Sequence, residues 1–178
     1  MRLFIAALLP DEIRARIDEY IGVLKPRCGG VKWEQRDKLH VTLKFLGSVG
    51  DSKVPGVSSI IDGLVRNYSP FGTDITGFGG FPEIRRPRIL YIELLENPGL
   101  SSLQGSIDEA FVPLGFPRET RTFIPHVTIG RVKNGIRIKE PLPAPEKCKF
   151  TIDEIAVVRS ETRRDGSVYT PLNIFRLR

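Results

Sequence analysis

Two short segments of this chain share a core, and this repetition constrains its fold more than any other feature. "KLHVTLKFLG" (38–47) and "IPHVTIGRVK" (124–133) each contain His-Val-Thr followed by an aliphatic residue. The chain has only two histidines, His40 and His126, and each begins one of these motifs. A single histidine on a strand is more often structural than catalytic. Two copies that use every histidine make coincidence a poor explanation, so we interpret the pair as functional.

Both motifs lie in segments rich in β-branched and apolar residues, which predicts strands. Side chains alternate between the two faces of a strand, so His40 and Thr42 share one face while Val41 points to the other. The same alternation places His126 beside Thr128. The apolar residues would anchor each strand in a core and leave an imidazole next to a hydroxyl on the open face.

The chemistry available to such a pair is proton transfer. Two imidazoles can act as acid and base near neutral pH, and a threonine hydroxyl can donate a hydrogen bond to a phosphate oxygen. Two such pairs facing one another could hold a phosphodiester, with one histidine activating water and the other protonating the departing oxygen. We expect no metal and no other cofactor. A metal site is the alternative, but strand-borne ligands usually appear as His-x-His or with a carboxylate where these motifs have threonine.

The rest of the chain reads as mixed strands and helices. Apolar runs, apolar alternation and β-branched residues predict strands at 2–9, 31–35, 39–47, 70–82, 88–96, 123–132, 150–162 and 168–177. Helical spacing of apolar residues predicts three helices. The first begins at Pro10 and has Ile13, Ile17, Ile21 and Leu24 on its apolar face, and the others extend over 54–65 and 99–115. A strand, a helix and a His-Val-Thr strand thus occur twice, which indicates an internal duplication.

This order predicts an α+β protein of two similar lobes with largely antiparallel sheets and helices on the outside. We expect one bilobal domain over 1–178, with the first half at about 1–85 and the second at about 86–178. The lobes could interleave near the end of the chain.

Composition limits the class of protein. The chain is 40% hydrophobic and 27% charged, and no apolar run approaches the roughly 18 residues of a membrane span. "MRLFIAALLPDEI" reads as a strand running into a helix rather than a signal peptide, so we expect a cytoplasmic protein. The net charge of +6 favours a polyanionic partner. Cys28 and Cys148 form no metal or disulfide framework, although pairing of these two is an alternative.

At these residues the sequence resembles the two-histidine phosphoesterases, which carry two His-x-Thr-x motifs. More narrowly it is similar to the RNA 2′,3′-cyclic phosphodiesterases, historically called 2′-5′ RNA ligases. The similarity extends to the opening "MRLFIAALLP", to "LHVTLKFLG" and to "PHVTIGR", and it covers essentially the whole chain.

The resemblance implies a bilobal fold with a basic central cleft and a pseudo-twofold axis relating the motifs. It implies hydrolysis of a terminal 2′,3′-cyclic phosphate on RNA to a 2′-phosphate, with 2′-5′ ligation as the reverse reaction. His40 would be the proton donor and His126 the proton acceptor, while Thr42 and Thr128 would hold the non-bridging phosphate oxygens. The partner would be RNA with cyclic phosphate ends, with tRNA fragments as one candidate, and the protein would act as a monomer.

Phe45 and Arg131 each lie five positions after a motif histidine. The resemblance implies that both contact the terminal nucleotide, Phe45 by stacking on the base and Arg131 by charge. On a regular strand, odd spacing would turn each away from its histidine, so a bulge or strand end must intervene. Core packing for Phe45 and a solvated edge for Arg131 are the alternatives. Trp33 and Tyr169 could likewise stack on substrate or only pack.

Further basic side chains could extend an RNA track: Lys44, Arg118, Arg121, Arg159, Arg163 and Arg164. "RSETRRDG" (159–166) is typical of an exposed hairpin turn. Two other functions stay open at this point. One is an RNA-end binding protein without turnover. The other is a phosphodiesterase acting on a cyclic mononucleotide, an ADP-ribose cyclic phosphate or a 2′-5′ oligonucleotide.

Overall fold

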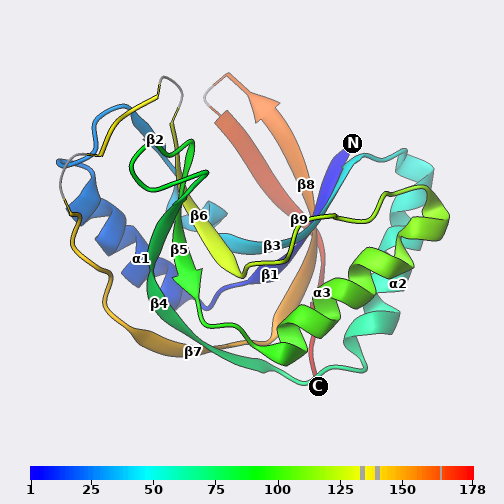
Figure 1. The fold of residues 1–178 in the computed structure, drawn as a ribbon. Helices are drawn as coiled ribbons and strands as arrows, with labels where there is room; N and C mark the ends of the chain where they lie inside the picture. Colours follow the sequence, from blue (N-terminus) through cyan, green and yellow to red (C-terminus); the bar gives the residue numbers. More distant parts are fainter. Residues whose placement is uncertain (133–134, 139–140, 165) are drawn as a thin grey trace.

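The computed structural model describes residues 1–132, 135–138, 141–164 and 166–178. Within these ranges, three α-helices and nine strands form a mixed α+β protein, as predicted (Figure 1). The helices are α1 (Asp11–Leu24), α2 (Val54–Val65) and α3 (Pro98–Ala110). No helix in the described ranges is long and apolar enough to cross a membrane.

The strands form one sheet in which all neighbouring strands run antiparallel. They are β1 (Arg2–Leu8), β2 (Val31–Trp33), β3 (His40–Ser48), β4 (Phe71–Phe81), β5 (Ile89–Leu94), β6 (His126–Val132), β7 (Cys148–Ile152), β8 (Glu154–Arg163) and β9 (Gly166–Arg176). Their order is β7-β4-β5-β6-β3-β1-β8-β9, and β2 pairs with β6. The prediction of a largely antiparallel architecture is therefore confirmed.

The two motif strands, β3 and β6, are neighbours at the centre of the sheet. They divide it into a β3 wing (β3, β1, β8, β9) and a β6 wing (β6, β5, β4, β7, β2), which diverge in Figure 1. Each wing contains strands from both parts of the chain, because β4 lies beside β5 while β8 lies beside β1. The division of the sequence into duplicated halves stays a prediction.

Strand β1 is apolar at every position from Leu3 to Leu8, because it is buried on both faces. Leu3 and Ile5 belong to the large core, whereas Phe4 and Ala6 join Val158 in a smaller cluster on the opposite face of the sheet. A strand buried on both faces needs apolar residues at consecutive positions. On the face that the helices leave uncovered, β1 therefore contributes buried apolar side chains to the β3 wing.

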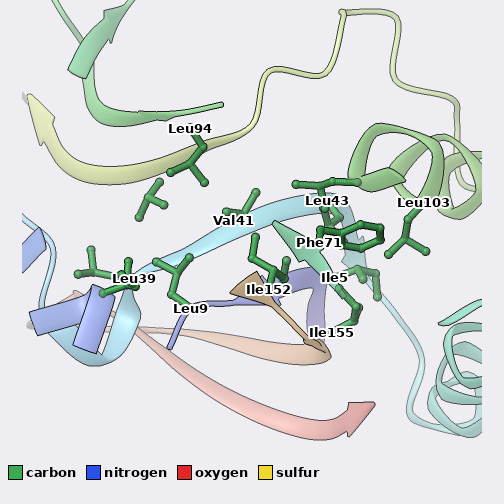
Figure 2. Close-up of a cluster of buried hydrophobic side chains, with 14 of the residues drawn as sticks. Ile5, Leu9, Leu39, Val41, Leu43, Phe71, Leu94, Leu103, Ile152 and Ile155 are labelled. Atoms are coloured by element: carbon green, nitrogen blue, oxygen red, sulfur yellow. The ribbon is translucent and has the colours of Figure 1, made fainter. Parts of the chain in front are cut away.

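The large core lies between the sheet and the helices. α1 packs into it through Ile13, Ile17, Ile21 and Leu24, the residues predicted to form its apolar face. Figure 2 labels further members of this core: Ile5, Leu9, Leu39, Val41, Leu43, Phe71, Leu94, Leu103, Ile152 and Ile155. Because all three helices contribute to this cluster, they cover one face of the sheet, and the motif residue Val41 points toward them.

Two predicted boundaries were wrong. The strand expected over 150–162 is two strands, β7 and β8, separated at Asp153, and they pair with β4 and β1 respectively. The helix expected over 99–115 ends at Ala110 and is followed by a short 3-10 turn. Pro113 explains the second error, because proline cannot donate the next helical hydrogen bond.

The predicted hairpin at 159–166 is present as the β8–β9 connection, where Arg163 pairs with Gly166. Asp165, part of the expected turn, lies outside the described residues. Cys28 and Cys148 are both free thiols, so the alternative in which they pair was wrong.

Candidate active site

A single backbone pair joins the two motif strands: Val41 of β3 lies opposite Val127 of β6. Both valines are fully buried, so their side chains point into the helix-covered core. The residues on either side of each valine must point to the opposite face. His40 and His126 therefore lie on one face with the two motif threonines, and we call this the histidine face.

Antiparallel pairing also determines the arrangement of the four polar side chains. With the valines opposite one another, His40 lies across from Thr128, and Thr42 lies across from His126. The two histidines are diagonal neighbours, a relation that places such residues about 7–8 Å apart. A local twofold axis thus passes between the strands, as the resemblance implied.

Both imidazoles are held in the same orientation by the backbone. The Nδ1 of His40 donates to the carbonyl of Lys38 at 2.6 Å, and the Nδ1 of His126 donates to the carbonyl of Ile124 at 2.7 Å. A carbonyl can only accept, so each neutral ring carries its proton on Nδ1 and leaves Nε2 as an acceptor. The Thr42 hydroxyl lies 3.1 Å from the Nε2 of His40.

Burial makes both histidines weak bases. Desolvation lowers the pKa of His40 from 6.5 to about 4; the Lys38 carbonyl opposes this shift, and positive charge on Arg131 and His126 adds to it. Burial also lowers the pKa of His126, less strongly, against the hydrogen bond to the Ile124 carbonyl. In the free protein at neutral pH both rings are therefore neutral.

Aromatic side chains surround His40. Phe4 stacks on the imidazole with ring centroids 4.9 Å apart, and Tyr169 of β9 meets it edge-on at 5.4 Å. The two aromatics also contact each other at 5.1 Å. Burial raises the pKa of the Tyr169 phenol, so it stays protonated. Tyr169, left open by the sequence, thus packs against the motif histidine.

His126 has aromatic neighbours of its own. Tyr91 of β5 and Phe81 of β4 each lie with ring centroids 5.3 Å from the imidazole, and they stack on each other at 4.3 Å. Sequence reasoning missed these two residues and Phe4. Nothing local distinguishes them from core aromatics, because the contacts join strands that are distant in sequence.

A β-bulge places Phe45 on the histidine face. Along β3 and β1 the register passes from Ala6–Thr42 to Ile5–Lys44, which leaves Leu43 as an extra residue. Phe45 then pairs with Phe4, whose ring stacks on His40. Phe45 is 71% exposed, so the alternative of core packing was wrong.

The second motif contains the same irregularity. Thr128 pairs with Tyr91 and Gly130 with Leu90, so an extra residue again follows the threonine, and Arg131 returns to the histidine face. Its Nε donates to a carboxylate oxygen of Glu34 at 3.2 Å. The bulge that sequence reasoning required for both residues is thus present in each motif.

The chain matches the family model of the 2′-5′ RNA ligase superfamily over residues 9–164. It belongs to that superfamily. It is 35% identical to the RNA 2′,3′-cyclic phosphodiesterase of Methanothermobacter thermautotrophicus over 99% of both chains. It is 32% identical to the one of Thermotoga maritima, over 97% of this chain and 93% of the relative.

Several solved structures share the fold of this chain. A Thermus thermophilus protein superposes with a TM-score of 0.83 at 31% identity, covering 99% of this chain and 98% of the other. E. coli LigT complexed with 3′-AMP superposes with a TM-score of 0.81 at 26% identity, covering 99% and 97% respectively. The recognition made from the motifs is confirmed.

The prediction that Lys44 extends the RNA track was wrong. Lys44 of this superfamily member is buried, and its ammonium group binds the carboxylate of Asp108 in α3 and the carbonyl of Pro117 at 2.9 Å. It pairs with Ile5, a residue of the helix-covered core. The bulge that turns Phe45 toward the histidine face thus turns Lys44 away from it.

The arginines of the β8–β9 hairpin mostly lie elsewhere. Arg159 pairs in register with Leu3, a residue of the large core, so it shares the helix-covered face. Arg159 and Arg163 both lie near the carboxylate of Glu161, at 3.7 and 3.5 Å. Arg164 is exposed at the turn and stays a candidate for the RNA track.

Arg118 and Arg121 lie in the segment that leads into β6 and are exposed. Arg118 pairs with Glu109 at 3.0 Å, and Arg121 pairs with Glu119 at 3.1 Å. Their contact with RNA stays a prediction. Trp33, also left open by the sequence, packs with the large core.

The residue types around the histidines do not suggest a metal centre. In the part of the chain that the structure describes, no group of three or more His, Cys, Asp and Glu side chains is placed to hold a metal ion. The four motif side chains are two imidazoles and two hydroxyls, which offer proton transfer and hydrogen bonding.

Proposed function

We propose that this protein hydrolyses terminal 2′,3′-cyclic phosphates of RNA to 2′-phosphates by acid/base catalysis at His40 and His126. The observation that carries the proposal is the placement of both imidazoles on the histidine face, each with its Nδ1 bound to a backbone carbonyl. Curated relatives named RNA 2′,3′-cyclic phosphodiesterase support the choice of substrate.

The reaction is an in-line displacement at phosphorus. The Nε2 of His126 accepts a proton from water, and the water oxygen forms a bond to phosphorus. The bond from phosphorus to the 3′-oxygen breaks, and His40 donates a proton from its Nε2 to that oxygen. The products are a 2′-phosphate and a free 3′-hydroxyl. Thr42 and Thr128 donate hydrogen bonds to the non-bridging oxygens, on which negative charge develops.

His40 must take up a proton from solvent when the substrate binds. In the free protein His40 has the more strongly lowered pKa, although it serves as the acid in this scheme. An anionic phosphate next to the ring favours the charged imidazolium and raises its pKa. Substrate binding thus prepares the acid, and proton uptake accompanies binding.

Phe45 and Arg131 would hold the terminal nucleotide. Phe45 presents an exposed ring on the histidine face, where a base could stack on it. Arg131 lies on the same face, half-exposed, and offers a guanidinium to phosphate or base. The structures of E. coli LigT with 3′-AMP and with phosphate support a nucleotide site in this fold.

The same groups would carry 2′-5′ ligation, in which a nucleoside 5′-hydroxyl, rather than water, attacks the cyclic phosphate. The bond from phosphorus to the 3′-oxygen breaks and a 2′-5′ linkage forms, so the reaction is the reverse of cleavage of such a linkage by the 3′-hydroxyl. We also expect a monomeric protein that acts on RNA ends, tRNA fragments among them. Light scattering of the purified chain tests the oligomeric state, and incubation with a 5′-hydroxyl oligonucleotide tests ligation.

Histidine substitutions test the hydrolytic mechanism. His40→Gln and His126→Gln keep a polar side chain but remove the proton-transfer group, so each is expected to lower kcat by at least about 100-fold with a 2′,3′-cyclic oligonucleotide. The assay contains EDTA, and circular dichroism checks folding. Full activity in either folded variant would refute the acid/base roles. Tight binding without turnover by the unmodified protein would instead support the RNA-end binding alternative.

A further inference from the structure

A cavity of about 600 Å³ adjoins the histidine face on the side of the β6 wing. Tyr91 lines it, and the ring of Tyr91 also contacts His126. Ile84 and Leu142 supply apolar wall, while Arg85 and Glu93 supply charge. A cavity of this volume with a few polar groups suits a small planar ligand such as a nucleobase.

The Glu93 carboxylate is the informative group in this wall. Glu93 pairs in register with His126, so its side chain lies on the histidine face. No hydrogen bond or ion pair engages its carboxylate among the residues that the structure describes. A protein that carries a net charge of +6 and binds a polyanion gains nothing from a carboxylate directed at phosphate. The carboxylate instead suits a neutral group with N–H donors.

Two glycines of β4 leave the space in which these side chains lie. Gly77 and Gly79 are the register partners of Glu93 and Tyr91. A Cβ on Gly79 would come within 2.5 Å of the Tyr91 hydroxyl oxygen, and one on Gly77 within 2.8 Å of a Glu93 carboxylate oxygen. Both side chains can therefore lie across β4 only because these positions have no side chain.

The donor pattern of the bases selects among possible occupants. A carboxylate has two acceptor oxygens, and the Watson–Crick edge of guanine presents two adjacent donors, N1–H and N2–H₂. Adenine and cytosine place an acceptor nitrogen beside their amino group, which a carboxylate repels. Arg85 adds a donor suited to the O6 acceptor of guanine.

We infer that this cavity is a guanine-preferring subsite for the nucleotide that precedes the cyclic phosphate end, with Glu93 as its specificity determinant. The inference rests on the proposed function, in which the terminal base stacks on Phe45 beside His40. The cavity adjoins His126 rather than His40, so it receives a different nucleotide of the same strand.

Dinucleotide substrates test the subsite. The substrates are GpC, IpC and ApC, each ending in a 2′,3′-cyclic phosphate, together with cytidine 2′,3′-cyclic phosphate as the mononucleotide. For the unmodified protein we expect kcat/KM to be at least about 10-fold higher with GpC than with ApC. IpC, which lacks the 2-amino group, should fall between them.

Glu93→Gln is expected to reduce the GpC-to-ApC ratio to near 1 and to change kcat/KM for the mononucleotide much less than kcat/KM for GpC. Glu96→Gln, an exposed residue outside the cavity wall, is the matched control and should keep the ratio. If Glu93→Gln does not fold, Arg85→Ala, at an exposed position, is used in its place. Arg85→Ala should also lower the GpC-to-ApC ratio.

An unchanged ratio in folded Glu93→Gln, or no preference in the unmodified protein, would overturn the subsite. An equal loss on the mononucleotide would overturn it too, because Glu93 would then act at the terminal nucleotide. Failure of the unmodified protein to hydrolyse the mononucleotide and every dinucleotide would instead count against the proposed function.

Discussion

Val41 pairs with Val127 across the two central strands, and these are the residues that stand between histidine and threonine in each motif. The two motifs thus pair through equivalent residues, and this pairing relates the two imidazoles by a local twofold axis. Because both valines are fully buried, the core that holds them also determines where the histidines lie. Packing in the helix-covered core is therefore coupled to the relative placement of the two imidazoles on the histidine face.

This coupling predicts the effect of Val127→Ala. Loss of two buried methyl groups should lower the free energy of unfolding by about 2 kcal/mol, as measured by urea denaturation. It should also lower kcat more than it raises KM, since the imidazoles lose their mutual register. Val23→Ala, at a position 44% exposed on α1, is the control and should change neither. Unchanged kcat in the destabilised variant would contradict the coupling.

The lowered pKa of His40 predicts a pH-dependent stability. The pKa is about 4 in the folded protein and 6.5 in the unfolded chain, so between these values only the unfolded chain binds the proton. This histidine therefore makes the free energy of unfolding rise with pH from about 4 to 6.5, by up to about 3 kcal/mol. Urea denaturation at pH 4.5 and 7.5 measures the change.

His40→Gln removes this contribution, so the variant should lose less stability than the unmodified protein on going from pH 7.5 to 4.5. Carboxylates titrate equally in both proteins and cancel in the comparison. An identical pH dependence in the two proteins would show that His40 is not desolvated.

Thr128→Ala should weaken the hold on the phosphate. A hydrogen bond to a charged group contributes about 1.5–3 kcal/mol, which corresponds to a loss of roughly 10- to 150-fold in kcat/KM. Thr128→Ser keeps the hydroxyl and should retain most of the activity. Equal activity of the alanine and serine variants would remove Thr128 from the proposed site.

Phe45→Ala separates binding from folding. The ring is 71% exposed, so its loss should change the free energy of unfolding by no more than about 0.5 kcal/mol. Loss of base stacking should raise KM by roughly 5- to 150-fold, since each stacked base contributes about 1–3 kcal/mol. Phe45→Trp offers a larger stacking surface and should restore binding. A large loss of stability with unchanged KM would indicate a structural role instead.

The buried ion pair of Lys44 and Asp108 predicts an asymmetric response. Lys44→Met leaves the buried carboxylate without its cation, which should cost about 3–5 kcal/mol of stability. The double variant Lys44→Met/Asp108→Leu removes both charges and should recover much of that loss. Arg164→Ala, at the exposed hairpin turn, should have little effect on stability. Denaturant midpoints of these variants decide whether the pair acts as a unit.

The sequence by itself determined most of the elements and the faces on which the motif side chains lie. Spacing of Ile13, Ile17, Ile21 and Leu24 predicted the face that α1 buries, and alternation in the motifs predicted which side chains share a face with each histidine. These properties are local, because helical and strand periodicity depend only on residues close along the chain. The repeated motif also pointed to the family.

Only the tertiary structure decided which long-range partners meet. The extra residue after Thr42 and after Thr128 reverses the alternation, so Phe45 and Arg131 reach the histidine face while Lys44 turns into the core. A bulge depends on the register of the neighbouring strand, which the motif itself does not contain. The approach of Tyr91 and Glu93 to His126 likewise requires the pairing of β5 with β6, two strands separated by α3 in the sequence.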